Sequence, residues 1–207
     1  LCGGEALDLP LAQQLLPCGR ELWNLYGPTE TTIWSAAIHI DESLLEEGFV
    51  PIGGPIDNTE FHILDEQQQA VPVGIPGELH IGGAGLSKGY LNRSELTAER
   101  FVTGLTPTAT LYKTGDLVRR RANGTLEYMG RLDHQIKLRG FRIELGEIEA
   151  VLNDHPDVDQ SLVMLRANGT HEPQLVAYCK VWAKVDLVDN PPALRQDIGS
   201  QLPTYML

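Results

Sequence analysis

The feature that most constrains the fold is a close succession of short β-strand patterns between residues 60 and 130. Five segments there favour strands, namely residues 60–64, 78–82, 111–113, 117–121 and 125–129. The pair Asn123-Gly124, between the last two segments, is a strong signal for a hairpin turn. One polar helix, predicted over residues 94–101 with Ser94 as its N-cap, interrupts the strands. The middle of the chain therefore predicts a small sheet or a distorted barrel.

The segments on either side of this β-rich stretch follow a different pattern, in which helices are interspersed with strands. Before it, we expect a helix at residues 8–16 and strands at residues 21–26 and 33–40. After it, we expect strands at residues 135–138, 141–143, 159–166 and 174–184, and helices at residues 145–153 and 192–202. The change of pattern predicts a domain boundary near residues 131–133.

Composition and charge exclude several classes of function. The chain has 16 Lys and Arg residues against 28 Asp and Glu residues, so it is a poor general binder of nucleic acids or anionic membranes. The N-terminus has no start Met and no apolar signal segment, and no apolar run approaches the roughly 18 residues of a membrane span. We therefore expect a piece of a larger protein. Three cysteines without a C-x-x-C pair argue against a disulfide framework or a zinc site and favour a reducing, cytoplasmic location.

The glycine-rich loop GGAGLSKG follows the second of the β-strand segments, and it fits neither a dinucleotide fingerprint nor a Walker loop. It does contain the G-x-S-x-G pattern of an α/β-hydrolase elbow at Gly85, Ser87 and Gly89. Asp116 and His134 would complete a catalytic triad in the right order. A five-residue pattern often arises by chance, and no His-Gly-Gly oxyanion loop lies upstream. A tight structural turn is therefore the favoured interpretation, and a hydrolase is the alternative.

Residues 24–30 (NLYGPTE) place a ring, a hydroxyl and a carboxylate at the end of a predicted strand. Tyr26 could stack on a base, Thr29 could meet a phosphate and Glu30 could hold Mg²⁺. An ordinary Gly-Pro turn is the alternative. The carboxylate of Asp116 could accept hydrogen bonds from both hydroxyls of a ribose, or could cap its own turn. Each segment taken alone leaves both interpretations open.

Five motifs in this order together resemble the adenylation domains of nonribosomal peptide synthetases, in the adenylate-forming superfamily that includes acyl-CoA synthetases and luciferases. The motifs occupy residues 24–30, 77–91 (GELHIGGAGLSKGYL), 112–117 (YKTGDL), 130–149 (GRLDHQIKLRGFRIELGEIE) and 202–206 (LPTYM). The resemblance implies an α/β fold: the C-terminal part of the enzyme core, with an α/β layer and a small distorted β-barrel, followed by a small α+β subdomain. The implied divisions are residues 1–60 for the end of the α/β core with the nucleotide and substrate pocket, 61–132 for the barrel-like part and 133–207 for an incomplete, mobile C-terminal subdomain.

The resemblance implies that the parent enzyme activates an amino acid. ATP and the amino acid give aminoacyl-AMP and pyrophosphate, with Mg²⁺ as the metal. The aminoacyl group then passes to the phosphopantetheine thiol of a peptidyl carrier protein domain. A condensation domain of the same assembly line is a further implied partner, and the product is a secondary metabolite. This chemistry needs positioning and charge neutralisation more than a covalent protein group.

The family's site residues carry over to this sequence position by position. The implied nucleotide-binding residues are Gly4, Glu5, Asn24, Tyr26, Gly27, Thr29, Asp116 and Arg131. Among them, Tyr26 would stack on adenine, Asp116 would hold the ribose hydroxyls and Thr29 would bind the α-phosphate. Glu30 is the implied Mg²⁺ ligand, and Arg131 would contact ribose or phosphate. Thr29, Glu30 and Arg131 form the implied catalytic set.

The implied substrate pocket contains Leu1, Gly3, Leu25, Ile33 and Trp34. All five residues are uncharged, so a charged substrate side chain would find no partner there. Trp34 is the largest and would leave little room beyond the substrate Cα. The set resembles the pocket half of glycine-activating members and predicts glycine, with cysteine second and alanine or serine third.

Two departures from the family pattern bear on activity. The family's Ser/Thr/Gly-rich phosphate loop would precede residue 1 and its Asn-Gly-Lys lysine would follow residue 207, so we expect the fragment alone to be inactive. Ser87-Lys88 stands where the family often has Ala-Arg.

Asp133 lies in a loop that matches the family's hinge. An acyl-CoA or aryl-acid ligase is the runner-up within the superfamily, and a catalytically inactive interaction module is the alternative from another class.

Overall fold

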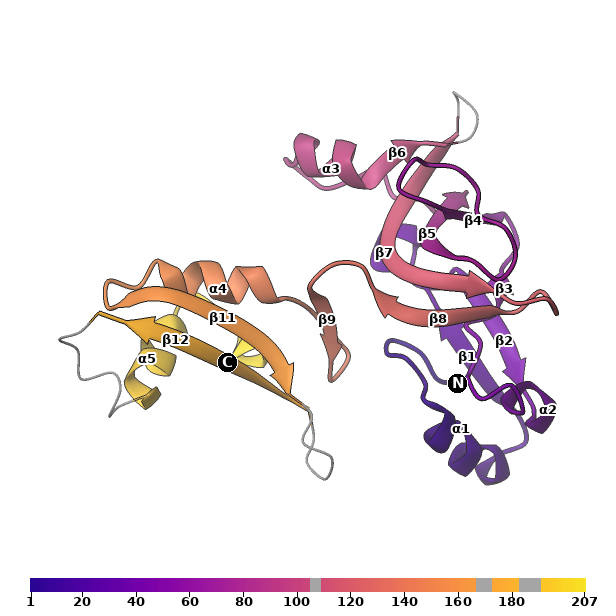
Figure 1. Ribbon diagram of the computed structural model, residues 1–207, viewed down its shortest axis with the longest axis horizontal. Coiled ribbons are helices and arrows are strands. Elements are labelled where there is room, and N and C mark those ends of the chain that lie inside the picture. Colours follow the sequence, from indigo (N-terminus) through magenta and orange to yellow (C-terminus); the bar gives the residue numbers. More distant parts are fainter. Residues whose placement is uncertain (105–108, 167–172, 183–190) are drawn as a thin grey trace. The chain divides into compact units, whose positions relative to one another are not determined.

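The structure is a computed structural model that describes residues 1–104, 109–166, 173–182 and 191–207 (Figure 1). Contacts between residues divide the chain into two units, Leu1–Asp133 and His134–Leu207. The division lies next to the boundary that the change of sequence pattern predicts. Each unit has a hydrophobic core of its own.

A three-stranded antiparallel sheet and two short helices form the N-terminal part of the first unit. The sheet has the order β1 (Leu22–Tyr26), β2 (Ala36–Ile40), β3 (Gly54–Pro55), and the helices are α1 (Leu9–Leu15) and α2 (Glu42–Leu45). The strand predicted over residues 33–40 begins only at Ala36. Thr32 and Ile33 have φ angles of 64° and 70°, a left-handed conformation that a strand cannot contain. The local core consists of Ala12, Leu22, Ile40, Leu45 and Val50.

A strongly curved, five-stranded antiparallel sheet follows. Its order is β4 (Thr59–Leu64), β5 (Pro76–Gly83), β7 (Thr110–Arg120), β6 (Phe101–Thr103), and β8 (Leu126–Arg131) also pairs with β7. The prediction of separate strands at residues 111–113 and 117–121 is wrong. Instead β7 runs through Gly115, whose φ of 74° lets the strand bend without ending. Register shifts against both β5 and β8 accompany the bend, which Figure 1 shows in β7.

The two sheets of the first unit share one hydrophobic core. Its buried members come from both sheets and the segments between them, and are Tyr26, Ala36, Ile52, Ile63, Leu79, Ile81, Val118 and Leu126. Tyr26 is the last residue of β1, and Val118 lies in β7. This shared core therefore brings the end of β1 against β7, where several of the predicted site residues stand.

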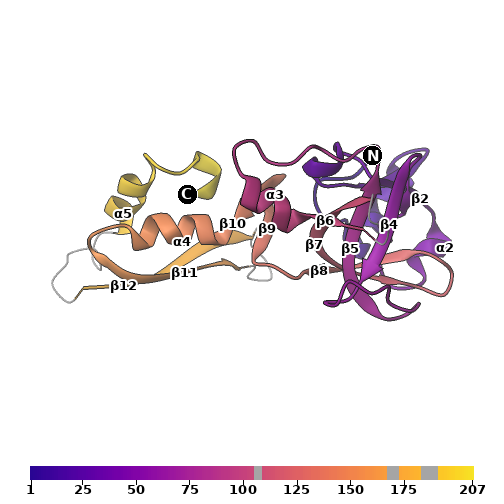
Figure 2. The ribbon, with the colours of Figure 1, turned by 90° about the horizontal axis from the view of Figure 1, so that it is seen from above.

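Within its described residues, the second unit has two antiparallel strand pairs, two α-helices and the short helix η4 (Thr204–Met206). The strand pairs join β9 (Gln135–Leu138) with β10 (Phe141–Glu144) and β11 (Val158–Arg166) with β12 (Gln174–Val181), and the α-helices are α4 (Leu145–Asn153) and α5 (Pro191–Ile198). One face of α4 buries Leu145, Ile148 and Leu152, as its periodicity predicts. Helix α4 packs along β11 (Figure 2). The end of the strand predicted over residues 174–184 lies partly outside the described residues.

The helices begin and end near, but not always at, the predicted residues. Asp8 caps α1, because its Oδ1 accepts a hydrogen bond of 2.7 Å from the backbone of the third helical residue. Ser94 is not the N-cap of α3 (Ser94–Arg100) but its first helical residue, and the preceding Arg93 makes no side-chain capping bond. Helix α5 ends at Ile198, before the predicted residue 202. Among the described residues, no helix is long and apolar enough to cross a membrane.

Candidate functional site

A buried cluster, where the last residues of β1 and β8 meet the middle of β7, contains Tyr26, Asp116 and Arg131. The Tyr26 hydroxyl donates a hydrogen bond of 2.5 Å to Asp116 Oδ2, and Arg131 Nη1 donates one of 2.9 Å to Asp116 Oδ1. Asp116 and Arg131 stand opposite each other in the pairing of β7 with β8. Tyr26 is 8% exposed and Asp116 4%. The structure thus brings together three residues that the sequence assigns to the nucleotide.

Burial and charge keep the Tyr26 hydroxyl and the Arg131 guanidinium protonated at neutral pH. Burial, followed by the nearby Asp116 carboxylate, raises the pKa of Tyr26 well above its usual value. The same two causes raise the pKa of the neighbouring Tyr128 to about 12. Burial lowers the pKa of Arg131, but the hydrogen bond to Asp133 and the charge of Asp116 outweigh it and leave the pKa above its usual value. At neutral pH, Tyr26 and Arg131 are therefore donors to Asp116.

The backbone on the N-terminal side of Asp116 fixes the position of its carboxylate. Thr114 Oγ1 donates to a backbone carbonyl of β5 at 2.7 Å and accepts a bond of 3.0 Å from the Asp116 backbone N. A Cβ on Gly115 would lie 2.7 Å from both Arg131 Nη2 and Asp133 Oδ2, so only glycine fits there. Sequence reasoning missed Thr114 and Gly115 as site residues, although both lie in the YKTGDL motif.

Arg131 also holds Asp133, the predicted hinge residue. Its Nε donates to Asp133 Oδ1 at 2.6 Å and its Nη2 donates to Asp133 Oδ2 at 2.7 Å, which makes a bidentate pair. Nη2 also donates to the Thr114 carbonyl at 3.0 Å. Arg100 Nη1 lies 3.6 Å from Asp133 Oδ2. One guanidinium therefore links the Asp116 carboxylate to the last residue of the first unit.

The predicted phosphate and metal residues, Thr29 and Glu30, lie in the short helix η2 (Thr29–Thr31) directly after the Gly-Pro turn. The turn needs Gly27, because a Cβ there would lie 2.4 Å from the carbonyl oxygen of Ile33. Thr29 is exposed and Glu30 is partly buried. The hydroxyl of Tyr90 donates a hydrogen bond of 2.6 Å to Glu30 Oε1. Burial, followed by this bond, raises the pKa of Tyr90, so its hydroxyl stays protonated.

Three of the five predicted pocket residues lie together. A Cβ on Gly3 would lie 2.6 Å and 2.7 Å from the ring atoms Cη2 and Cζ3 of Trp34, and 3.0 Å from the carbonyl oxygen of Leu25. Two backbone hydrogen bonds of 2.8 Å hold the N-terminal segment along β1. Leu1 and Ile33 are instead 87% and 62% exposed.

The remaining predicted nucleotide residues differ in their surroundings. Gly4 and Glu5 are exposed, just beyond the segment that pairs with β1. Asn24 is 4% exposed, and its Nδ2 donates a hydrogen bond of 2.9 Å to the carbonyl of Pro51. This bond ties β1 to the segment before β3 and holds the strand from which Tyr26 projects.

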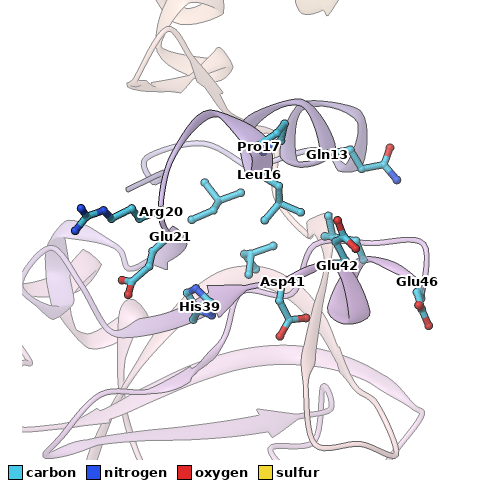
Figure 3. Close-up of a pocket in the computed structure, with 12 residues that line it drawn as sticks. Gln13, Leu16, Pro17, Arg20, Glu21, His39, Asp41, Glu42 and Glu46 are labelled. Atoms are coloured by element: carbon cyan, nitrogen blue, oxygen red, sulfur yellow. The ribbon is translucent and has the colours of Figure 1, made fainter.

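A separate groove of about 650 Å³ lies between α1, α2, β1 and β2 (Figure 3). Figure 3 labels side chains on its two sides: Gln13, Leu16 and Pro17 on one, and His39, Asp41, Glu42 and Glu46 on the other. The Asp41 carboxylate accepts hydrogen bonds from the Ser43 hydroxyl at 2.6 Å and the Leu44 backbone N at 3.0 Å, and these bonds lower the pKa of Asp41. None of the lining residues belongs to the Tyr26 cluster. The lining has four acids against one arginine, which does not suit an anionic nucleotide.

The structure does not support the hydrolase hypothesis for Ser87. A nucleophile elbow is a sharp turn from a strand directly into a helix. Here β5 ends at Gly83 and α3 begins only at Ser94, so Ser87 lies in the middle of a non-helical connection. The Asp116 carboxylate is bonded to the tyrosine and the arginine of the buried cluster.

Comparison with known proteins identifies the family. The model described as AMP-binding enzyme matches residues 1–91. The chain is 50% identical over 209 residues to a dimodular nonribosomal peptide synthase of Bacillus subtilis (strain 168), in a match that covers 100% of this chain and 8% of that protein. A solved holo protein with adenylation and PCP domains, bound to a vinylsulfonamide inhibitor, is 32% identical with a TM-score of 0.85, over 99% of this chain and 35% of that one. A four-domain nonribosomal peptide synthetase bound to AMP and glycine is 46% identical with a TM-score of 0.60, over 94% of this chain and 14% of that one.

These similarities confirm the predicted fold class, an α/β core with a curved sheet followed by an α+β unit. The chain spans less than a tenth of the length of the Bacillus subtilis relative. Its match to the solved adenylation domains extends over nearly all of its own residues. The chain therefore belongs to the AMP-binding, adenylate-forming enzymes, as part of the adenylation domain of a nonribosomal peptide synthetase.

Proposed function

We propose that the protein containing this chain activates an amino acid by adenylation. The amino-acid carboxylate attacks the α-phosphate of ATP, pyrophosphate leaves, and an aminoacyl-adenylate forms. The observation that carries this proposal is the buried cluster of Tyr26, Asp116 and Arg131, because it offers a ring, a carboxylate and a cation side by side to a nucleoside phosphate. The cluster also stands next to the Gly-Pro turn that leads from Tyr26 to Thr29 and Glu30.

Each residue of the proposed site has a physical role. Asp116 accepts hydrogen bonds from the ribose hydroxyls, and Arg131 holds that carboxylate in place while contacting ribose or phosphate. Tyr26 contacts the adenine ring, and its hydroxyl bond to Asp116 fixes the ring orientation. The exposed hydroxyl of Thr29 donates to an α-phosphate oxygen. Donors positioned in advance stabilise the charge that develops on the α-phosphate.

The residues present suit a magnesium ion that arrives with the nucleotide. Mg²⁺ is usually bound by one or two carboxylates together with substrate phosphates and water. In the described part of the chain, no group of three or more His, Cys, Asp or Glu side chains could hold a metal ion without such help. Glu30 supplies one carboxylate, in the turn that also presents Thr29. Bound there, Mg²⁺ would neutralise phosphate charge, and Glu30 is the residue of this chain that would hold it.

Glycine is the proposed substrate. The contact between Gly3 and the Trp34 ring supports it, because the indole lies so close to the backbone of the N-terminal segment that a Cβ on Gly3 would clash with it. The solved relative bound to AMP and glycine, at 46% identity, also favours this assignment. A larger substrate side chain would have to displace the Trp34 ring.

The proposed partners are a peptidyl carrier protein domain with its phosphopantetheine thiol and a condensation domain of the same assembly line. Solved relatives that contain adenylation and PCP domains support the first. Asp133 is proposed as the hinge for the change between adenylation and thioester formation, because it is the last residue of the first unit.

The test is amino-acid-dependent ATP–pyrophosphate exchange by the intact adenylation domain that contains this chain, measured over a panel of amino acids. Exchange that is highest with glycine is the expected result. If none of the amino acids supports exchange, the proposed function is refuted. Adenylation of an acid without an amino group would instead favour an acyl-CoA or aryl-acid ligase. Ester cleavage that is lost in Ser87→Ala would favour the hydrolase.

A further inference from the structure

The glycine-rich loop between β5 and α3 is hydrogen-bonded to the turn that carries Glu30. The Ser87 backbone N donates to the Glu30 carbonyl at 2.8 Å, and Thr32 Oγ1 donates to the Gly85 carbonyl at 2.7 Å. The third bond is the one of 2.6 Å from the Tyr90 hydroxyl to Glu30 Oε1. The first bond holds the backbone of the turn at Glu30, the second joins the Thr32 side chain to the backbone of the loop, and the third holds the Glu30 carboxylate itself.

Tyr90 is itself fixed in position by α3 and β6. Its backbone N donates a hydrogen bond of 2.9 Å to Thr97 Oγ1 in α3. The preceding Gly89 has φ of 117°, and a Cβ there would lie 2.3 Å from Thr97 Cγ2, so only glycine allows this approach. The Tyr90 ring packs edge-on against Phe101, with the ring centroids 5.9 Å apart. The hydroxyl therefore reaches Glu30 from a rigid support.

We propose that Tyr90 is a positioning residue that orients the Glu30 carboxylate for the metal ion of the adenylation reaction. This inference rests on the proposed role of Glu30 as the Mg²⁺ ligand. A carboxylate with one oxygen held by a fixed donor keeps a single orientation, and loss of such an outer-shell bond typically costs about 10- to 100-fold in metal affinity. The glycine-rich loop would then help to position Glu30, together with Tyr90, which directly follows it. Ser87 contributes only its backbone N to this arrangement.

The test compares Tyr90→Phe with wild type in the intact adenylation domain, because this variant keeps the ring and removes only the hydroxyl. Binding of Mn²⁺ to the enzyme with ATP is followed by electron paramagnetic resonance of the free ion. We expect the apparent Kd for Mn²⁺ to rise about tenfold or more. The kcat of pyrophosphate exchange at limiting Mg²⁺ should fall, while the KM for the amino acid changes little.

Two further variants separate positioning from a general structural effect. In a Glu30→Gln background, adding Tyr90→Phe should cause no additional loss of Mn²⁺ affinity, because the carboxylate that it orients is gone. Tyr178→Phe is the matched control: it removes another tyrosine hydroxyl, on the exposed surface of the second unit, where Arg166 donates to it at 2.8 Å. Its Mn²⁺ affinity should equal that of wild type.

The outcomes distinguish this inference from the proposed function. If the wild-type domain shows amino-acid-dependent exchange but Tyr90→Phe binds Mn²⁺ as tightly as wild type, the inference alone is wrong. An equal loss of affinity in the wild-type and Glu30→Gln backgrounds would also overturn it. Should Tyr90→Phe unfold below the assay temperature, Thr97→Val serves instead, because it removes the acceptor that fixes the Tyr90 backbone; unchanged Mn²⁺ affinity there would refute the inference.

Discussion

Replacing Arg131 by glutamine should cost far more stability than replacing its partner Asp133 by asparagine. Arg131 donates hydrogen bonds to both Asp116 and Asp133, but the two carboxylates differ in burial. The Asp116 side chain is 5% exposed, whereas the Asp133 side chain is 26% exposed. Arg131→Gln leaves the buried Asp116 carboxylate without its cation, and breaking a buried pair in this way costs about 3–5 kcal/mol. Asp133→Asn removes a charge that water still reaches, which costs about 1 kcal/mol or less.

The assay is urea unfolding of the intact adenylation domain, combined with hydrogen exchange of the backbone amides in β7 and β8. Arg131→Gln should lower the urea midpoint and speed exchange around residue 116, because these strands hold the carboxylate that has lost its cation. Asp133→Asn should leave both measurements close to wild type. If the two variants lose equal stability, the argument from burial is wrong.

Three further predictions follow from the described contacts. Asp116→Ala should raise the KM for ATP by a factor of tens to about a hundred, since a charge-assisted pair to the ribose contributes about 2–3 kcal/mol; an unchanged KM and kcat in pyrophosphate exchange would remove Asp116 from the site. Trp34→Ala should let the domain activate larger amino acids such as leucine, and a substrate panel that still favours only glycine would contradict the pocket assignment. Burial lowers the pKa of His80, whose Nε2 has no hydrogen-bond partner among the described residues. The unfolded chain therefore binds a proton at this histidine at higher pH than the folded chain does. Stability should fall as the pH drops below about 6.5. His80→Leu should make this fall shallower in unfolding measured between pH 7 and pH 5, and an identical pH dependence would refute it.

Local pattern predicts those parts of the fold in which neighbouring residues decide the structure. The buried face of α4 follows from its periodicity, and the turn at Asn123-Gly124 follows from the preference of Gly124 for its φ of 88°. The bend of β7 at Gly115 is different. A glycine in a strand pattern permits either an end or a bend, and only the pairing with β5 and β8 decides between them.

Tertiary contacts override local preference in the segment before β2. The β-branched Ile33 favours an extended backbone, yet its φ is 70°. Its carbonyl lies against Gly27, and the Ser35 backbone N donates to the Tyr26 carbonyl at 2.8 Å, so the loop closes back on β1. No residue type in this segment predicts that the loop closes back on β1.

The candidate site was accessible from sequence only through its ordered motifs. Tyr26 and Asp116 are separated by 90 residues, and Glu30 and Tyr90 by 60, so no spacing rule connects them. The motifs identify Tyr26, Asp116 and Glu30 separately as candidate site residues. The hydrogen bond of Tyr26 to Asp116 joins residues of different sheets, which pack on one core, and the bond of Tyr90 to Glu30 likewise joins residues that only the fold brings together.

The close approach of Trp34 to Gly3 restricts the order in which the proposed substrate pocket can change during evolution. Any residue larger than glycine at position 3 brings a Cβ within 2.6 Å of the indole, so it is tolerated only after Trp34 has become smaller or has moved. The reverse order meets no such clash, because a smaller residue at position 34 leaves Gly3 undisturbed. If glycine is the substrate, as proposed, a lineage that moves to a bulkier substrate should therefore pass through intermediates altered at position 34 first. Directed evolution that randomises position 3 alone should return Gly3.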